Sequence, residues 1–212
     1  MANQERRNLI EALLGMCMGV GGLLLLGYFL WGHVPGLASP PATAVPLTPT
    51  PALIELWDAY GQARAVARAE AGDAQLVSAS TQWQAVSAGT LLDGADNWSF
   101  LFYSPVSSEA LDVVVDTGTA RVVNRTRVWV MPKALAEGDW RAGPRDALLA
   151  FLAYGGRVFL EEHPQAVVNL HLAERDDGGP AWSIVALDAK ERSLLSLLVD
   201  AETGRVASCS GG

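Results

Sequence analysis

The hydrophobic and polar positions divide the chain into three stretches with different patterns. Residues 12–31 form an unbroken run of twenty uncharged positions that is rich in Leu and Gly. This run has the length that a helix needs to cross about 30 Å of hydrocarbon. Residues 32–50 are rich in Pro, which favours a semi-rigid extended spacer. The sequence therefore predicts a cytoplasmic segment over residues 1–8, a transmembrane helix over residues 9–31 and a linker before a folded region.

The residues beside the apolar run predict its orientation. Arg6 and Arg7 precede it, and Tyr28 and Trp31 lie at its far end. The positive-inside rule then places the N-terminus in the cytoplasm and the C-terminal region outside it, in a single-pass protein of the cell membrane. Two alternatives stay open: a signal peptide cleaved after the small residues 42–44, and a twin-arginine export signal that begins at Arg6.

Three glycines give the predicted membrane helix one nearly flat face. Gly15 and Gly19 form a small-xxx-small pair, and Gly22 lies about one turn further on. Such a face lets another helix approach closely. We expect a membrane protein subunit as partner, although glycine is also common in spanning helices that have no partner.

The folded region contains an internal repeat. Trp98 and Trp182 begin similar apolar segments that are 84 positions apart. Asp116 and Asp200 begin similar turns with the same separation, and Gly204 follows in the second turn. Agreement of two blocks in one register predicts two structural copies, residues 51–135 and residues 136–212.

Each copy is predicted to be a helix followed by an antiparallel sheet, which is an α+β fold. The first helix is expected to begin at Pro51 and the second at Pro144, with Pro164 ending the second. Residues 59–61 and 153–155 are taken as matching parts of these helices, so the first copy has about ten extra residues before Trp98. The predicted strands cover residues 74–80, 98–104, 111–116 and 120–130, then 166–173, 182–187, 193–200 and 205–208.

The second copy resembles a PepSY-type unit in residues 180–184 and in the closing hairpin over residues 199–206. The first copy is a degenerate version, with Ala120 where the motif has Gly and with Gly118 shifted earlier. The resemblance implies a cystatin-like fold outside the cytoplasm and a binding or inhibitory module that is often associated with peptidases. It brings no catalytic residues to this chain.

Charge and composition narrow the possible partners. The chain has a net charge of −8 and a pI near 4.8, and residues 1–44 contribute nothing to that excess. An acidic folded region disfavours nucleic acid and anionic lipid head groups as its partners. The lipid bilayer is expected as a partner through the predicted membrane helix, and nucleic acid is not expected as a partner.

The candidate chemical groups favour structural roles. Cys17 and Cys209 lie at opposite ends of the architecture, so no disulfide and no cysteine-based metal site is expected. His163 follows Glu161 and Glu162 at the predicted end of a helix, where consecutive side chains point in different directions, so we expect a solvated helix end. His171 is expected on the surface of a sheet.

The repeated aspartates, Asp116 and Asp200, could be read as a pair of catalytic carboxylates. They fit turn residues better, because an Asp side chain accepts hydrogen bonds from the amides that follow it. Trp98 and Trp182 are expected to pack each sheet against its helix. We accordingly expect no catalytic residue, cofactor or metal.

These features predict a non-catalytic, membrane-anchored accessory or scaffold subunit of a larger membrane protein complex. The alternative is a PepSY-type regulator or inhibitor of an extracytoplasmic peptidase, which rests on the family resemblance alone.

Overall fold

The computed structural model describes residues 54–136, 138–176 and 178–211. The predicted membrane helix with Gly15, Gly19 and Gly22, the linker and Cys17 lie outside this range. Among the helices within it, none combines the length and the apolar character needed to cross a bilayer.

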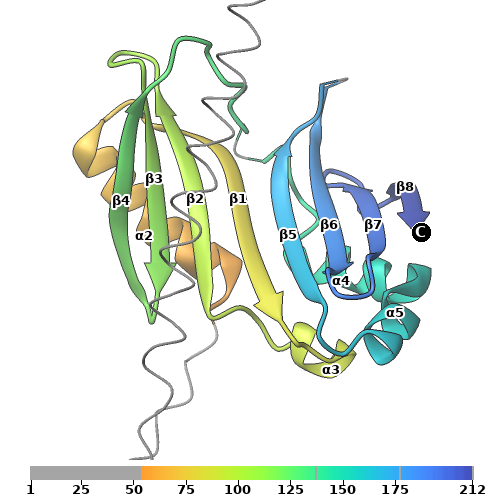
Figure 1. The fold of residues 1–212 in the computed structure, drawn as a ribbon. Helices are drawn as coiled ribbons and strands as arrows, with labels where there is room; N and C mark the ends of the chain where they lie inside the picture. The colour runs from red at the N-terminus through yellow and green to blue at the C-terminus, as the bar shows by residue number, and fades with distance from the viewer. Residues whose placement is uncertain (1–53, 137, 177, 212) are drawn as a thin grey trace, which may run out of the picture. The chain divides into compact units, whose positions relative to one another are not determined.

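All the described strands belong to one antiparallel sheet (Figure 1). Their order across the sheet is β4-β3-β2-β1-β5-β6-β7-β8. The structure thus has the predicted α+β class, with helices followed by antiparallel strands, but both sets of strands join into a single sheet. The strands are β1 (Gln75–Gln84), β2 (Asn97–Ser104), β3 (Glu109–Asp116), β4 (Thr119–Arg127), β5 (Val167–Glu174), β6 (Pro180–Asp188), β7 (Ser193–Asp200) and β8 (Val206–Gly211).

The main helices cover one face of the sheet, and each packs on the strands that follow it in the chain. Helix α2 packs on β2, β3 and β4, and helix α4 packs on β6 and β7 (Figure 1). Apolar side chains from both sets of elements form one continuous buried core. The helices are α2 (Leu56–Glu70), the short α3 (Ala88–Leu91), α4 (Pro144–Phe151), the π-helical turn η1 (Leu152–Gly156) and α5 (Arg157–Glu162).

The central strands of the two copies have the same register. Trp98 lies opposite Val115, and Trp182 lies opposite Val199. Both tryptophans are buried. In each strand, the tryptophan and every second residue after it point toward the helices. The 84-residue spacing therefore corresponds to a repeated pairing of β2 with β3 and of β6 with β7.

The two copies meet through their first strands. Strands β1 and β5 pair antiparallel, with Ser80 opposite His171. On their other sides Ser80 lies opposite Ser99 and His171 opposite Ser183, which are equivalent positions of the repeat. Equivalent residues therefore face each other at this seam, as they do across a twofold axis.

The first helix begins later than the sequence predicts. Helix α2 starts at Leu56, because Ile54 is extended and its N–H donates to the carbonyl oxygen of Ala95 at 2.9 Å. Ala95 lies between β1 and β2, in a connection that includes helix α3 and is longer than the one between β5 and β6. Ala59 and Ala147 are each the fourth residue of their helix, and both are fully buried.

The second helix is broken where the sequence predicts a continuous one. Gly155 has a φ of +106°, a left-handed conformation that glycine adopts readily. At Gly156 an added Cβ would lie 2.4 Å from Cε1 of Phe151, so that ring occupies the space of a side chain. Tyr154 is exposed beside this break, whereas Tyr60 packs against Phe100. The sequence suggested that residues 153–155 match residues 59–61. The structure shows that they do not.

Strand boundaries agree with the predictions within two residues except at three ends, one of which is that of β8, which continues to Gly211 rather than ending at residue 208. Strand β1 continues to Gln84, and β4 ends at Arg127 rather than at residue 130. The backbone leaves the β3–β4 ladder after Val128, whose N–H donates to Ser108 at 2.9 Å. Trp129 is consequently exposed.

Candidate functional site

The end of helix α5 places one histidine against the sheet. His163 follows Glu162 as the C-cap of α5, and its N–H donates to the carbonyl oxygen of Phe159 at 2.8 Å. Its ring packs on the ring of Phe159, with 4.5 Å between centroids. Only 12% of the His163 side chain is exposed. The expected solvated helix end is therefore wrong for this residue.

Asp188 at the end of β6 is fixed by the backbone of the following loop. Its Oδ1 accepts hydrogen bonds from the N–H groups of Lys190 at 2.9 Å and Glu191 at 3.2 Å. Its side chain is only 7% exposed, and its Oδ2 lies 3.5 Å from Nδ1 of His163. The loop amides thus orient one carboxylate oxygen toward the imidazole.

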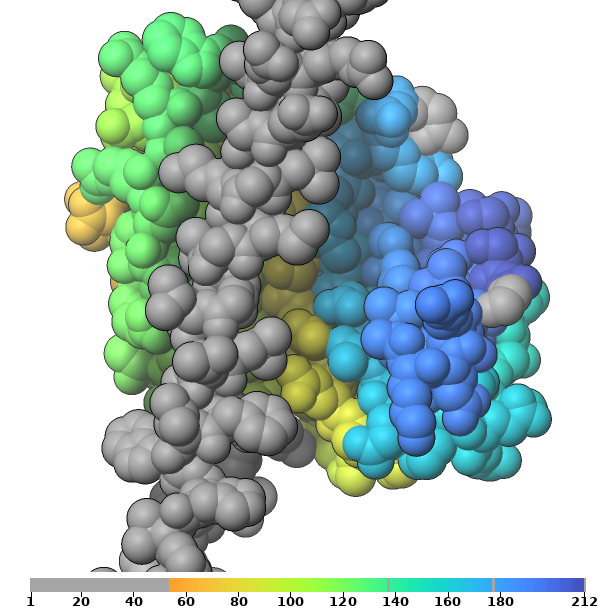
Figure 2. All heavy atoms as spheres, viewed as in Figure 1, coloured from red at the N-terminus to blue at the C-terminus, as the bar shows by residue number. Residues whose placement is uncertain are grey.

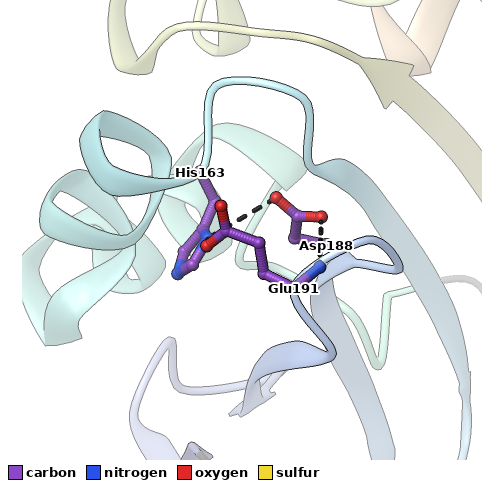
Figure 3. Close-up of side chains that lie close together, drawn as sticks. All are labelled: His163, Asp188 and Glu191. Atoms are coloured by element: carbon purple, nitrogen blue, oxygen red, sulfur yellow. Dashed lines mark hydrogen bonds and ion pairs between the residues drawn. The ribbon is translucent and has the colours of Figure 1, made fainter.

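Glu191 completes a three-residue cluster. Its Oε2 lies 3.1 Å from Nδ1 of His163, and 56% of its side chain is exposed. Nδ1 of His163 is buried, yet it makes no hydrogen bond. One ligand atom from each residue lies within 4.8 Å of the others. Figure 3 shows the three side chains coming together between the end of α5 and the β6–β7 loop. Within the described residues, this is the group of side chains that could hold a metal ion.

Solvent reaches the cluster from one side. A surface hollow of about 510 Å³ is lined in part by Glu162, His163 and Ser193. Val158, Leu194 and Leu195 line its apolar part. The cluster therefore lies at the rim of an open hollow, between α5 and the loop that joins β6 to β7.

Sequence reasoning missed this cluster because its members are distant in the chain. It weighed Glu161 and Glu162 as partners of His163, but the structure leaves both glutamates exposed. Asp188 and Glu191 meet His163 only because β6 returns beside the end of α5. No short motif signals such a contact.

The first copy has a different polar contact at the corresponding place. Ser104, which is 84 positions before Asp188, donates from Oγ to Oδ1 of Asp73 at 2.7 Å. The N–H of Val106 donates to Oδ2 of Asp73 at 2.8 Å. These bonds, led by that from Val106, hold the pKa of Asp73 below its ordinary value. Direct hydrogen bonds therefore join the helix–strand loop to the hairpin.

The repeated tryptophans make the same contact in both copies. Nε1 of Trp98 donates to the carbonyl oxygen of Ile54 at 3.1 Å, and Nε1 of Trp182 donates to that of Ala142 at 2.8 Å. Each acceptor lies two residues before the first residue of its helix. The indoles therefore fix where each helix begins on its sheet.

The repeated aspartates have different partners. Oδ1 of Asp200 accepts hydrogen bonds from the N–H and Oγ1 of Thr203, both at 2.8 Å. The bond from the Thr203 amide is the main cause that lowers the pKa of Asp200. Asp116 instead accepts from the guanidinium of Arg121 at 3.0 Å. We expected each aspartate to accept hydrogen bonds from the backbone amides that follow it. Asp200 does so, and Asp116 does not.

The turns that follow also differ. Gly204 has a φ of +71°, and in the first copy Thr117 and Gly118 adopt positive φ values of 45° and 77°. Ala120 lies in β4, so the first turn is shorter.

His171 is exposed on the sheet face opposite the helices. Cys209 is an exposed free thiol.

Comparisons with known proteins identify no family for this chain. No protein-family profile matches it, and no curated protein matches it. A protein from Clostridium difficile 630, described with its crystal structure as a "putative lipoprotein", is similar in structure with a TM-score of 0.46. The two sequences are 15% identical, and the similarity covers 72% of this chain and 92% of the other.

Proposed function

We propose that this protein is a membrane-anchored, extracytoplasmic accessory subunit whose folded region binds another membrane protein. The observation that carries the proposal is an exposed apolar segment, Trp129, Val130 and Met131. Their exposed fractions are 91%, 83% and 69%. Three consecutive large apolar residues on the surface favour an interaction site, whereas single exposed apolar residues are ordinary.

The exposed segment is attached to the sheet at both ends. On one side the N–H of Val128 donates to the carbonyl oxygen of Ser108 at 2.9 Å. On the other side the N–H of Leu135 donates to the carbonyl oxygen of Leu76 at 2.7 Å. Further along, Trp140 is buried and stacks on Trp57 with 4.5 Å between ring centroids. The exposed side chains are therefore presented from a backbone that is fixed on either side.

The chemistry of the segment suits a protein surface. Trp and Met are enriched in protein interfaces, and Trp is prominent among residues that dominate binding energy. The guanidinium of Arg127 lies 5.9 Å from the ring centre of Trp129, which adds a cationic group to the apolar one.

The neighbouring strand edge favours contact through side chains. Strand β4 is the outer strand beside this segment, and Arg121, Arg125 and Arg127 project from it. Charged residues on an edge strand disfavour addition of a further strand. Figure 2 shows β4 at the surface on one side of the molecule and β8 on the other. The proposed partner therefore packs on Trp129 to Met131 rather than extending the sheet.

Copurification of the full-length protein from detergent tests the proposal. The variant Trp129→Ser/Met131→Ser should lose a stoichiometric membrane partner that the wild-type protein retains. Val158→Ser is the matched control, because Val158 is 55% exposed and lies in helix α5 of the second copy, away from β4. A second variant, Gly15→Leu/Gly19→Leu, reports whether the predicted membrane helix also contacts that partner.

Each outcome has a clear meaning for the two functions. Loss of the partner in the Trp129 variant alone supports the accessory subunit. Retention of the partner in that variant would contradict the assigned surface. A wild-type protein that purifies without a partner, but slows an extracytoplasmic peptidase, would favour the regulator implied by the PepSY resemblance.

A further inference from the structure

We infer that His163, Asp188 and Glu191 form a binding site for a divalent metal ion of the zinc class. The inference is separate from the proposed accessory function and concerns the junction between α5 and the β6–β7 loop. It rests on the ligand set, on the unbonded Nδ1 of His163 and on the comparison with the first copy.

The contacts of Nδ1 argue against a simple hydrogen-bonded group. Nδ1 of His163 is buried and faces Oε2 of Glu191 at 3.1 Å and Oδ2 of Asp188 at 3.5 Å, but hydrogen bonds to neither. A buried polar atom without a partner is costly. A divalent ion bound among the three groups would give Nδ1 a partner and would balance the charge of the two carboxylates.

The spacing of the ligand atoms fits a small ion. Zinc binds imidazole nitrogen and carboxylate oxygen at about 2.0–2.2 Å in tetrahedral geometry, which separates two ligand atoms by about 3.3 Å. The two separations measured from Nδ1, 3.1 Å and 3.5 Å, lie on either side of that value. The carboxylate oxygens lie within 4.8 Å of each other. Glu191 is half exposed, so its side chain can adjust to close that edge.

The surroundings provide features that a metal site needs. The loop amides that bond Oδ1 of Asp188 fix that carboxylate, as outer contacts commonly do for metal ligands. The ring of Phe159 packs against the imidazole. The hollow beside Glu162 and Ser193 gives an entry path and room for water as the fourth ligand. One nitrogen and two oxygen ligands favour zinc over calcium, which prefers oxygen alone.

The first copy supplies an independent argument. There, Asp73 joins the helix–strand loop to the hairpin by accepting directly from Ser104 and from the N–H of Val106. In the second copy the position of Ser104 is taken by Asp188, and the facing group is an imidazole without a hydrogen bond. A bound ion would make the connection that hydrogen bonds make in the first copy.

Zinc titration of the full-length protein in detergent, after removal of metals with a chelator, tests the site. Calorimetry should show one zinc ion per chain, and thermal unfolding should shift upward with zinc. Glu191→Gln should weaken zinc binding about tenfold or more, because it removes a ligand charge at a half-exposed position where folding is not at risk. Glu161→Gln is the control, since Glu161 is exposed and adjacent in sequence to the helix end.

Cobalt(II) provides a second readout. A tetrahedral site should give the wild-type protein visible absorption bands that His163→Gln lacks and that Glu161→Gln keeps. Zinc binding that Glu191→Gln leaves unchanged would overturn the inference. The absence of stoichiometric binding to the wild-type protein would overturn it as well, and would leave the cluster as an ion pair.

Discussion

The two copies solve the same connection with different chemistry. In the first copy Asp73 accepts hydrogen bonds from Ser104 and from the N–H of Val106. In the second copy His163 faces Asp188 and Glu191 without a hydrogen bond at Nδ1. The connection lies at the end of the sheet, where substitutions do not disturb the apolar core. The repeat has therefore kept its packing while the polar contacts at this end diverged.

The helices of the copies show a second difference. Helix α2 is continuous, whereas the corresponding segment of the second copy bends at Tyr154 and Gly155 before α5. Phe151 fills the space beside Gly156. The bend divides one helix into two short ones, and the second of these ends at the histidine of the metal-binding candidate. A change in helix geometry thus accompanies the change in chemistry.

The largest expected effect concerns what the copies share. Trp98→Ala and Trp182→Ala should each lower the free energy of unfolding by about 3–5 kcal/mol, because each removes a buried indole and a hydrogen bond at the start of a helix. Urea unfolding of the purified protein measures this. Trp129→Ala is the control and should change stability little, since Trp129 is exposed. A large loss at only one of Trp98 and Trp182, or a loss of the same size at Trp129, would contradict equivalent core roles for the two buried tryptophans.

The next largest effect concerns the contrast between the continuous helix α2 and the broken helix of the second copy. Gly156→Ala should destabilise by about 1–3 kcal/mol, because its Cβ would overlap the ring and backbone of Phe151. Gly61→Ala, in the continuous helix, has open space around the new Cβ. It should stabilise by about 0.5–1 kcal/mol, since alanine favours a helix interior over glycine. Equal thermal shifts for the two variants would mean that the bend does not depend on this close approach.

The smallest effect concerns acid pH. The pKa of Asp73 is lower in the folded protein than its ordinary value, so the folded state holds the charged form more strongly. This stabilisation is fully present above about pH 4, the ordinary value for Asp, and is lost as pH falls through the lower folded pKa. Asp73→Asn should therefore reduce the fall in melting temperature between neutral pH and about pH 3. Asp96→Asn, at an exposed carboxylate, should leave that fall unchanged.

The sequence was informative wherever the structure depends on short-range patterns. Alternation of apolar and polar residues located the strands, and the common spacing of Trp98 with Trp182 located equivalent pairs of strands. Strand pairing repeats residue by residue, so one matched position fixes its neighbours. The α+β class followed from the same patterns.

Features that depend on contacts between distant residues were not predictable. The break at Gly155 and the close approach of Gly156 to the ring of Phe151 depend on tertiary packing, and Tyr154 suggested a false match with Tyr60. The pairing of β1 with β5 leaves no local signal, because both strands look like ordinary half-buried strands. The cluster around His163 requires a helix end and a hairpin to meet, which chain spacing does not reveal.

The seam between β1 and β5 also bears on the origin of the molecule. Ser80 and His171 are equivalent residues that lie opposite each other, and two identical subunits bring equivalent residues together in this way across a symmetric dimer interface. The arrangement accordingly matches that of a symmetric dimer whose two subunits are joined in one chain. Duplication of a single-copy ancestor would then have released each half from identical selection. A metal-binding junction could arise in one half while the other kept the hydrogen bonds of Asp73.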